Sequence, residues 1–504
     1  MSLSTQTAAE PQEQSVRLII SAVAVTLLLA SLGQTIVSTA LPTIVSELGG
    51  LEHLTWVVIA YLLSSTVVAP IYGKLGDLYG RKIVLQVAIV IFLIGAGLSA
   101  MASSMTFLII ARTVQGLGGG GLMVVAMTVV ADVIPPRQRG KIQGVFGAVF
   151  GVATVVGPLL GGFIVEHLSW HWIFLINLPL GILALAVIGF ALKPKTDRVA
   201  HKIDYMGFVL LTAALSAFVL ATSLGGNTFP WFSVQIIGLV ALSIGAVAAF
   251  IWVEKHAAEP VLPLELFRNN TFVVTNAVGF LVGMAMFGSI TFLPLYLQVA
   301  KGVSPTNSAL QLLPMMVGLI GASTLSGFVM SKTGRYKILP TLATTVLFVG
   351  MTLLGAMQIS TPDWQIALYM FLVGVGIGPV NSVGVTATQN AVPRALVGVA
   401  TAGNTLFRQI GGSIGVSVFG AIFSSNLASQ LGGEAPTGGG AFNAQAVQAL
   451  PEEARRQVVE GFAAALHPVF LTAAGAAVLA FGLSLLLREL PLANTLRKEP
   501  EAEL

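Results

Sequence analysis

The stretch Gly73-Lys74-Leu75-Gly76-Asp77-Leu78-Tyr79-Gly80-Arg81-Lys82 is a charged, glycine-rich turn between two long apolar runs. The run before it, 54–72, and the run after it, 83–102, carry no formal charge. Each is close to the ~20 residues that a helix needs to cross the hydrocarbon core of a bilayer. We therefore expect the turn to join two transmembrane helices. Its glycines let backbones pass closely, its aspartate can face the positive end of a neighbouring helix, and its last two cations can hold a lipid phosphate or a carboxylate.

Composition defines the broad class of the protein. Of 504 residues, 55% are hydrophobic and only 9% are charged, and the mean hydropathy is +0.89. Such a chain is expected to be an all-α polytopic membrane protein, because its apolar runs are long and continuous instead of short and alternating as in a barrel. The net charge of +4 comes from cations in short loops, which indicates membrane topology and no nucleic-acid partner. The absence of cysteine excludes a disulfide framework and thiol chemistry.

Fourteen apolar runs are long enough to be spans. The first run, 18–41, follows Arg17 and is too long for the core of a signal peptide. The other thirteen are 54–72, 83–103, 106–134, 142–165, 172–192, 205–224, 232–253, 271–299, 305–330, 339–359, 365–390, 396–425 and 463–487. An even number of spans puts both termini on one side, which would carry 20 of the 25 cations against 3 on the other. The positive-inside rule then predicts cytoplasmic termini in a bacterial-type inner membrane.

The chain also repeats itself. Gly327, Gly334 and Arg335 lie 254 residues after Gly73, Gly80 and Arg81, again between two predicted spans, although Ser331 replaces Asp77. Coincidence among glycine-rich loops is the alternative, but transporters built from two similar halves show such repeats. The predicted divisions are a tail 1–17, a six-helix half 18–192, a linker 193–270 with two inserted helices, a six-helix half 271–489 and a tail 490–504. The outer loop 426–461 of the second half would be a mobile flap or a tether.

The fifth predicted span is rich in glycine. Glycines three and four apart make a smooth face that packs closely on a neighbour, and a proline inside the span permits a bend. These features suit either a conformational gate or static helix packing. The residues concerned are Gly151, Gly157, Pro158, Gly161 and Gly162.

Several motifs resemble those of a known family. The pattern G-x-L-x-D-x-x-G-R-K in the first turn resembles the signature loop of the major facilitator superfamily, and V-V-G-P-L-L-G-G at 155–162 resembles its exporter motif. Segment 170–181 resembles the helix 5–6 junction of the fourteen-span drug:proton antiporter family (EmrB/QacA type), with His171 where that family usually has arginine. The resemblance covers about 18–425. It implies a major facilitator fold and export of lipophilic small molecules driven by a proton gradient, without a cofactor.

One departure from that family concerns proton coupling. The family typically has an aspartate before Thr35, where this chain has Gln34, and glutamine cannot titrate. We find no carboxylate near the middle of any predicted span; Asp77, Asp132 and Glu166 lie at span ends. The resemblance suggests that Asp132 pairs with the arginine of the first turn in a latch, and a solvated helix end is the alternative. Glu166 is either a proton site or a surface residue.

Arg112 and Arg408 are cations inside predicted spans, where an unpaired charge costs several kcal/mol. In the superfamily, the arginine of an R-x-x-Q-G pattern in helix 4 is linked to proton coupling, and Arg112 and Gln115 carry that pattern. Alternatively, these arginines bond to carbonyls and to glutamines such as Gln34, Gln115 or Gln409. If both arginines line a cavity, its positive field disfavours lipophilic cations and suits neutral or anionic amphiphiles, including lipids.

Soft and aromatic side chains on the ninth and tenth spans could form an adaptable substrate surface, as methionines often do, or belong to ordinary helix packing. They are Met284, Phe287, Phe292, Tyr296 and Met315. No Walker A loop, His-Glu-x-x-His motif or metal-ligand cluster occurs in the sequence, so we expect neither an enzyme nor a metal site. We predict a monomeric exporter of hydrophobic or amphipathic compounds; a lipid or glycolipid exporter of the same fold is the alternative.

Overall fold

The computed structural model describes residues 10–49, 53–192, 203–226, 228–430, 447 and 451–492. Residues 1–9 and 493–504 of the predicted tails, residues 193–202 and 227 of the predicted linker and most of the predicted outer loop lie outside these residues. The helices are α1 (Glu10–Thr35), α2 (Val37–Leu48), α3 (Leu54–Tyr79), α4 (Arg81–Ala100), α5 (Met105–Val133), α6 (Pro136–His167), α7 (Trp172–Leu175), α8 (Asn177–Ala191), α9 (Tyr205–Leu224), α10 (Val234–Glu254), α11 (Asn270–Val299), α12 (Pro305–Leu310), α13 (Leu313–Thr333), α14 (Ile338–Gly355), α15 (Asp363–Ala391), α16 (Val397–Gln430) and α18 (Glu452–Leu485). Short 3₁₀ helices cover Leu264–Arg268 and Arg394–Leu396.

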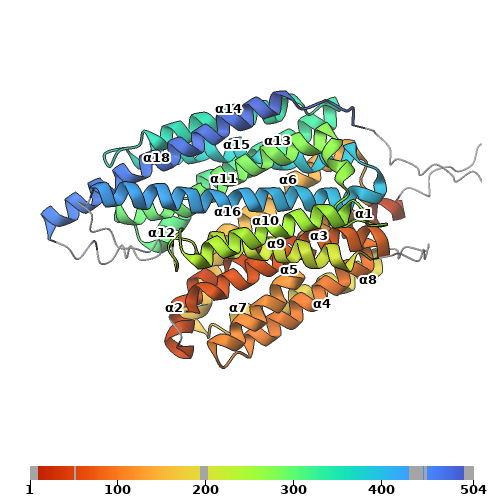
Figure 1. Cartoon of the computed structure of the whole chain (residues 1–504), viewed down its shortest axis with the longest axis horizontal. Coiled ribbons are helices and arrows are strands. Elements are labelled where there is room, and N and C mark those ends of the chain that lie inside the picture. The colour runs from red at the N-terminus through yellow and green to blue at the C-terminus, as the bar shows by residue number, and fades with distance from the viewer. Residues whose placement is uncertain are drawn as a thin grey trace, which may run out of the picture.

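Fourteen helical segments among the described residues are long and apolar enough to cross a membrane, which confirms the predicted fold class and number of spans. The segments run roughly parallel in one elongated bundle (Figure 1). The protein is therefore a multi-pass membrane protein with fourteen spans.

The first span differs from the prediction. Its helix starts at Glu10, its apolar span covers Val16–Thr35, and the chain changes direction at Ile36, after which α2 continues to Leu48. The carbonyl of Gly33 accepts a hydrogen bond from the Arg112 side chain at this point (2.9 Å). A side chain from another helix thus occupies a backbone acceptor at the break, and insertion of a side chain into the helical ladder is a known cause of such changes in direction.

The last two spans are longer than predicted. Helix α16 extends to Gln430, and α18 begins directly after Pro451, well before the predicted start at 463. Proline favours the start of a helix, and the pair Arg456–Glu460, four residues apart at 2.9 Å, supports the first turns of α18. At about 1.5 Å per residue, a helix as long as α16 or α18 is longer than the ~30 Å hydrocarbon core. Part of the predicted loop 426–461 is therefore helical.

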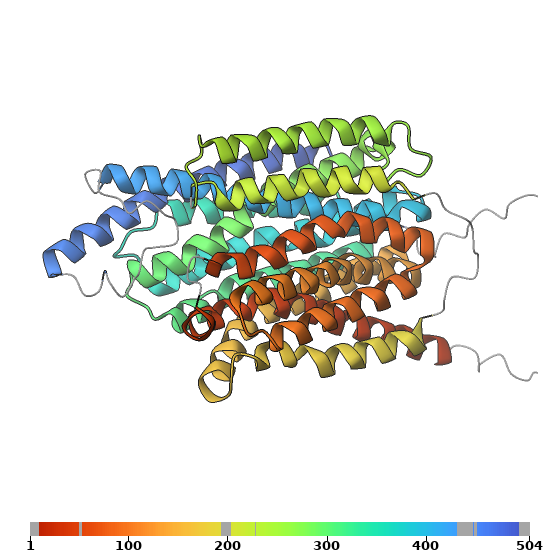
Figure 2. The same ribbon diagram turned by 60° about the horizontal axis from the view of Figure 1, so that its bottom comes forward.

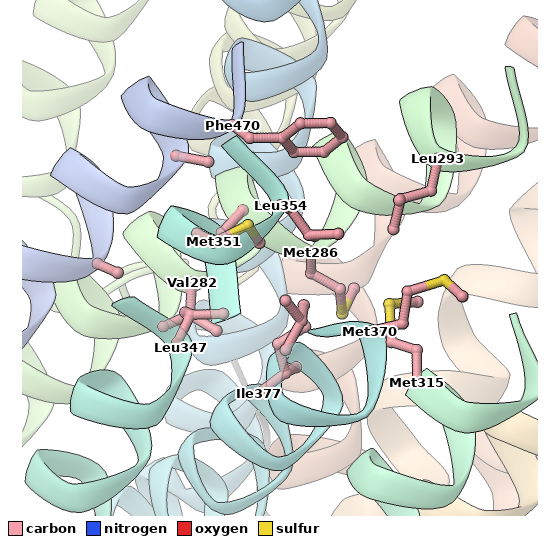
Figure 3. Packing of buried hydrophobic residues seen from close by; sticks show 14 of the residues in the cluster. Val282, Met286, Leu293, Met315, Leu347, Met351, Leu354, Met370, Ile377 and Phe470 are labelled. Carbon is pink, nitrogen blue, oxygen red and sulfur yellow. The ribbon is translucent and has the colours of Figure 1, made fainter. Parts of the chain in front are cut away.

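Two large apolar cores lie at opposite sides of the bundle. One consists of residues of α1, α3, α4, α5, α6 and α8, and the other of residues of α11, α13, α14, α15, α16 and α18. The second core is rich in methionine, and Figure 3 shows Met286, Met315, Met351 and Met370 side by side between helices. Flexible thioether side chains fill irregular gaps between helices.

Each of the two related loops follows a helix that ends at a glycine with positive φ, although the ψ values differ (137° at Gly80 and 7° at Gly334). Gly80 ends α3 with φ of 91°, and Gly334 ends α13 with φ of 71°. Only glycine adopts such values without strain, so each loop turns sharply at its glycine. We call the end of the bundle that carries these two loops the basic end, because Arg81, Arg137 and Arg394 also lie there, and we call the opposite end the far end.

Candidate functional site

Asp77 connects the two halves at the basic end. It lies in the last turn of α3, and its two carboxylate oxygens accept hydrogen bonds from the backbone N–H groups of Gly398 (3.0 Å) and Val399 (3.1 Å). These N–H groups belong to the first turn of α16, where helical N–H groups lack intrahelical partners and the helix dipole is positive. The side chain is only 2% exposed. A buried anion of one half thus binds the helix start of the other, as sequence analysis expected in outline.

Close approach of α3 to α16 depends on two glycines. A Cβ on Gly398 would lie 2.4 Å from the Gly73 carbonyl oxygen and 2.6 Å from both Asp77 carboxylate oxygens. A Cβ on Gly73 would in turn lie 2.7 Å from the Gly398 carbonyl oxygen. Larger residues at either position would push the two helices apart and break the hydrogen bonds of Asp77.

Arg81 extends this contact into a chain of alternating charges. Its guanidinium pairs with Asp77 (3.2 Å) and Asp132, and donates to the Thr128 carbonyl (2.8 Å). Asp132 also lies 3.8 Å from the guanidinium of Arg394, which belongs to the second half. The structure therefore brings together the latch residues Asp77, Arg81 and Asp132, and adds Arg394 to them.

A second contact between the halves was missed in the sequence. Arg137, at the start of α6, donates to the carbonyls of Ser331 (2.7 Å) and Lys332 (2.5 Å) in the last turn of α13. Carbonyls at a helix end lack intrahelical partners and attract cations. A sequence signal existed, because Pro393-Arg394 follows Pro136-Arg137 by 257 residues and so belongs to the internal repeat. In the structure, both arginines contact the other half.

The loop after α13 is held by the segment that follows α18. The buried side chain of Tyr336 donates its hydroxyl to the Arg488 carbonyl (3.2 Å) and accepts the N–H of Leu490 (3.1 Å). Leu492 donates its N–H to the carbonyl of Gly334 (3.2 Å). Burial is the main reason that the pKa of the Tyr336 hydroxyl is raised, so this hydroxyl remains a neutral donor. The second copy of the loop thus lacks an aspartate but is fixed by the chain that follows the last span.

The glycines of helix α6 pack against two neighbouring helices, α13 and α1. In its first part, a Cβ on Gly144 would lie 2.7 Å from Thr324 Cα on α13, and one on Gly151 would lie 2.8 Å from Ile320 Cδ1. In its second part, a Cβ on Gly157 would lie 2.4 Å from Thr35 Oγ1 at the end of α1. The exporter-like motif therefore lies where α6 passes from the second half to the first.

The remaining residues of that motif differ in their surroundings. Pro158 lies inside α6 next to Gly157. A Cβ on Gly161 would lie 2.4 Å from Thr39 Oγ1 on α2, whereas one on Gly162 would meet nothing within 4 Å. Among these glycines, Gly157 and Gly161 are thus required for packing against the first span.

Arg112 is fully buried among backbone acceptors. It donates to the carbonyls of Gly33 (2.9 Å) and Val57 (3.3 Å) and to Gln115 Oε1 (2.7 Å), and its guanidinium stacks on the Tyr61 ring at 4.4 Å. No carboxylate lies within ion-pair distance of it among the described residues, and its Nη2 has no acceptor there. The bonding partners correspond to the alternative of carbonyls and glutamines, and they join α1, α3 and α5.

Arg408 has a different environment. It is half-buried in the middle of α16, and its Nη1 donates to Asn381 Oδ1 on α15 (3.0 Å). Gln34 is half-buried on α1, next to the Gly33 carbonyl that binds Arg112, and Glu166 is exposed at the far end of α6. The structure therefore does not bring Glu166, Gln34 and Arg408 together in one site.

The expected substrate surface is mostly inside the second core. Phe292, Tyr296 and Met315 are 6%, 1% and 0% exposed, and the Tyr296 hydroxyl donates to the Gln358 carbonyl (3.1 Å). Met284 and Phe287 are half-buried and pack on α16, where a Cβ on Gly415 or Gly412 would meet them. In this conformation, all five side chains take part in helix packing.

Comparison with known proteins identifies the family. Residues 23–416 match the family model of the Major Facilitator Superfamily, so the chain belongs to this superfamily of transporters. It is 39% identical over 424 residues to the multidrug transporter protein MdtP of Bacillus subtilis, covering 84% of this chain and 78% of that protein. It is 33% identical over 477 residues to multidrug resistance protein 3 of the same organism, covering 92% and 93%. An uncharacterized MFS-type transporter of Mycobacterium tuberculosis is 42% identical over 481 residues, covering 95% of this chain and 70% of that protein.

Solved structures show the same fold at low sequence identity. The human organic anion transporter MFSD10 (TETRAN) has a TM-score of 0.62 at 15% identity, covering 93% of this chain and 99% of that chain. The proton:xylose symporter XylE also has a TM-score of 0.62 at 15% identity, covering 95% and 97%. These similarities concern the fold alone.

Proposed function

We propose that the protein is a multidrug efflux transporter that exports hydrophobic or amphipathic compounds by alternating access. The names of its relatives and its motifs support export as the direction of transport. The observation that carries the mechanism is the pair of contacts that closes the basic end, in which Asp77 binds the start of α16 and Arg137 binds the end of α13. Both contacts join the halves, so both must break when this end opens.

We place the basic end at the cytoplasm. The excess of cations in its loops agrees with the positive-inside rule. The closed conformation described above would then be the one that releases substrate outward, and opening of the basic end would admit substrate from the cytoplasmic side. A bacterial-type inner membrane and a monomeric state belong to the same proposal.

A proton gradient is the proposed source of energy. Gln34 cannot titrate, so coupling at this position of the first span is excluded for this chain. The carboxylates that join the halves, Asp77 and Asp132, change their contacts when the basic end opens and closes. They are the first candidates for a proton site, ahead of the exposed Glu166.

A lipid exporter is the second candidate function. The described spans place Arg112 and Arg408 between the two ends without a carboxylate partner. Positive charge in the membrane interior disfavours lipophilic cations and suits neutral or anionic amphiphiles, which include lipids. Whether the protein exports drugs or lipids, this charge distribution favours neutral or anionic amphiphiles as its substrates.

The test is export of a neutral dye, an anionic dye and a cationic dye from proteoliposomes, with and without an imposed proton gradient. Gradient-driven export of the neutral or anionic dye would support the proposal. If none of the three dyes is exported while a labelled phospholipid is transported, the result would support lipid export instead. A dye export rate that does not respond to the gradient would contradict proton coupling.

A further inference from the structure

The two inserted helices cover one side of the interface between the halves. Helix α9 packs on α3 of the first half and on α16 of the second, and α10 packs on α9. Figure 1 shows α9 and α10 side by side across the front of the bundle, and Figure 2 shows α10 outermost with α9 between it and the other helices. The insert is therefore more than a connection between the halves, because it touches both of them along the line where α3 meets α16.

One apolar cluster contains side chains of both halves and of the insert. Its buried members are Val67 and Ala131 from the first half, Leu211, Leu215 and Phe250 from the insert, Val261, Leu262 and Leu266 from the following loop, and Phe272, Val392, Val397, Val399, Ala400 and Leu406 from the second half. Val67 and Leu406 are only 5% and 4% exposed. The seam between α3 and α16 is thus shielded where it approaches the basic end.

Hydrogen bonds, in addition to apolar contacts, attach the insert to α16. The hydroxyls of Thr222 on α9 and Ser413 on α16 are 2.7 Å apart, and Ser417 Oγ donates to the Thr222 carbonyl (3.0 Å). In a bilayer, apolar surfaces gain little from contact with each other, because lipid tails are equally apolar, so interhelical hydrogen bonds add to attachment. Toward α3 the insert makes apolar contacts with side chains such as Leu63 and Val67.

In the described part of the chain, α9 and α10 have no counterpart over the opposite seam, between α6 and α13. Next to it, Val145 and Val152 on α6 are 44% and 49% exposed, and Leu325 and Phe328 on α13 are 65% and 45% exposed. The helices meet there through glycine, since a Cβ on Gly327 would lie 2.2 Å from the Gly140 carbonyl oxygen. Exposed apolar side chains thus flank a contact in which glycines of α6 lie against backbone atoms and against side chains of α13 such as Thr324 and Ile320.

We infer that α9 and α10 close the α3/α16 seam to the bilayer, and that substrate dissolved in the membrane reaches the interior through the α6/α13 seam when the basic end opens. This inference rests on the proposed export of lipophilic compounds. The insert stays with α16 through Thr222 and slides over α3, so that the first seam remains covered while the halves move. Lipophilic compounds concentrate in the bilayer, and separation of Gly140 from Gly327 opens a path that needs no rearrangement of the insert.

The route can be mapped with a lipophilic dye that carries a photoreactive diazirine. The dye is photolysed in proteoliposomes during gradient-driven export, and its adducts are located by mass spectrometry with and without excess unreactive dye. Adducts that the competitor removes are expected on 140–152 and 317–328, and to be absent from 63–67 and 397–400, which belong to the covered seam. The exposed outer face of α10, at 237–244, is the control, because adducts there reflect the bilayer and should not be competed.

Export is measured in the same vesicles, so the two proposals fail in different ways. Normal export with competed adducts on 63–67 or 397–400 would overturn the inference and leave the function intact. Absence of gradient-driven export of any dye would overturn the proposed function itself, and with it the route.

A disulfide tests whether the insert moves with α16. The chain contains no cysteine, so Thr222→Cys with Ser413→Cys introduces one defined pair. Oxidation is expected to leave the export rate within about twofold of the reduced protein. Loss of export that a reductant restores would show that α9 must leave α16 during transport and would overturn the inference. Thr222→Cys alone, treated with the same oxidant, controls for effects of oxidation.

Discussion

Replacement of Asp77 by asparagine tests the closure of the basic end. The substitution keeps the size of the side chain but removes the negative charge, and one of its two polar atoms becomes an N–H donor. In the unsubstituted protein, the backbone N–H groups of Gly398 and Val399 each donate to an Asp77 oxygen, at 3.0 and 3.1 Å. In the variant, the new amide N–H donor would face one of these N–H donors. One hydrogen bond is therefore lost, the other becomes neutral, and Arg81 keeps only Asp132 as a charged partner.

The size of the effect follows from these contacts. A hydrogen bond to a charged group contributes about 1.5–3 kcal/mol and a neutral one about 1 kcal/mol. Loss of the first and weakening of the second shift the equilibrium between closed and open by about 2–4 kcal/mol, since Asp77 is buried and little screened by solvent. At tenfold for each ~1.4 kcal/mol, the closed population falls about 30- to 700-fold relative to the open one.

Distances between spin labels at Gln138→Cys and Arg335→Cys report this equilibrium. Both positions are exposed at the basic end, one in each half, and the chain has no other cysteine. In the Asp77→Asn variant we expect a shift from short to long distances and slower export, with normal insertion into the membrane. Glu265→Gln, which removes the charge of an exposed carboxylate outside the network, should change neither. An unchanged distance distribution together with normal export would refute the role of Asp77 in closure.

Three further substitutions test other parts of the interface. Arg137→Ala leaves the last carbonyls of α13 without their donor and should lengthen the same label distances; unchanged distances would show that this contact does not hold the halves together. Gly327→Ala should prevent closure and slow export at least tenfold, because a Cβ would lie 2.2 Å from the Gly140 carbonyl oxygen, whereas Gly321→Ala, with nothing within 4 Å, is the control and should export normally. Arg112→Ala leaves buried acceptors unpaired at about 1–3 kcal/mol each, so the melting temperature in detergent should fall by several degrees. An unchanged melting temperature would contradict a structural role for this arginine.

The fold was predictable because membrane spans obey local rules. A run of about 20 apolar residues forms a helix wherever it lies, since backbone groups in lipid must pair within their own segment. The positions at which helices break or change direction were less predictable. The change of direction at Ile36 coincides with a hydrogen bond from Arg112, 76 residues further along the chain, and no local pattern reports such a contact.

The site was predictable only in part. The motif around Asp77 and Arg81 indicated a gating loop, and the structure adds the partner groups, which are backbone N–H groups of α16. Backbone groups carry no sequence signal, so the carbonyls bound by Arg137 were also missed. The aromatic and methionine residues of α11 and α13 pack between helices in this conformation, and their role as a substrate surface stays a prediction, because side chains suited to such a surface are equally suited to a packed core.

The sequence by itself determined the membrane class, the number of spans, the distribution of charge between loops and the residue types in the turn 73–82. These properties depend on hydrophobicity, length and local backbone preference, all of which act over a few neighbouring residues. Only the tertiary structure decided which helix end Asp77 binds, that Arg112 is held by carbonyls of other helices, and that α9 covers the seam between α3 and α16. Such contacts join residues that are distant in the chain, and their partners are chosen by how the helices pack.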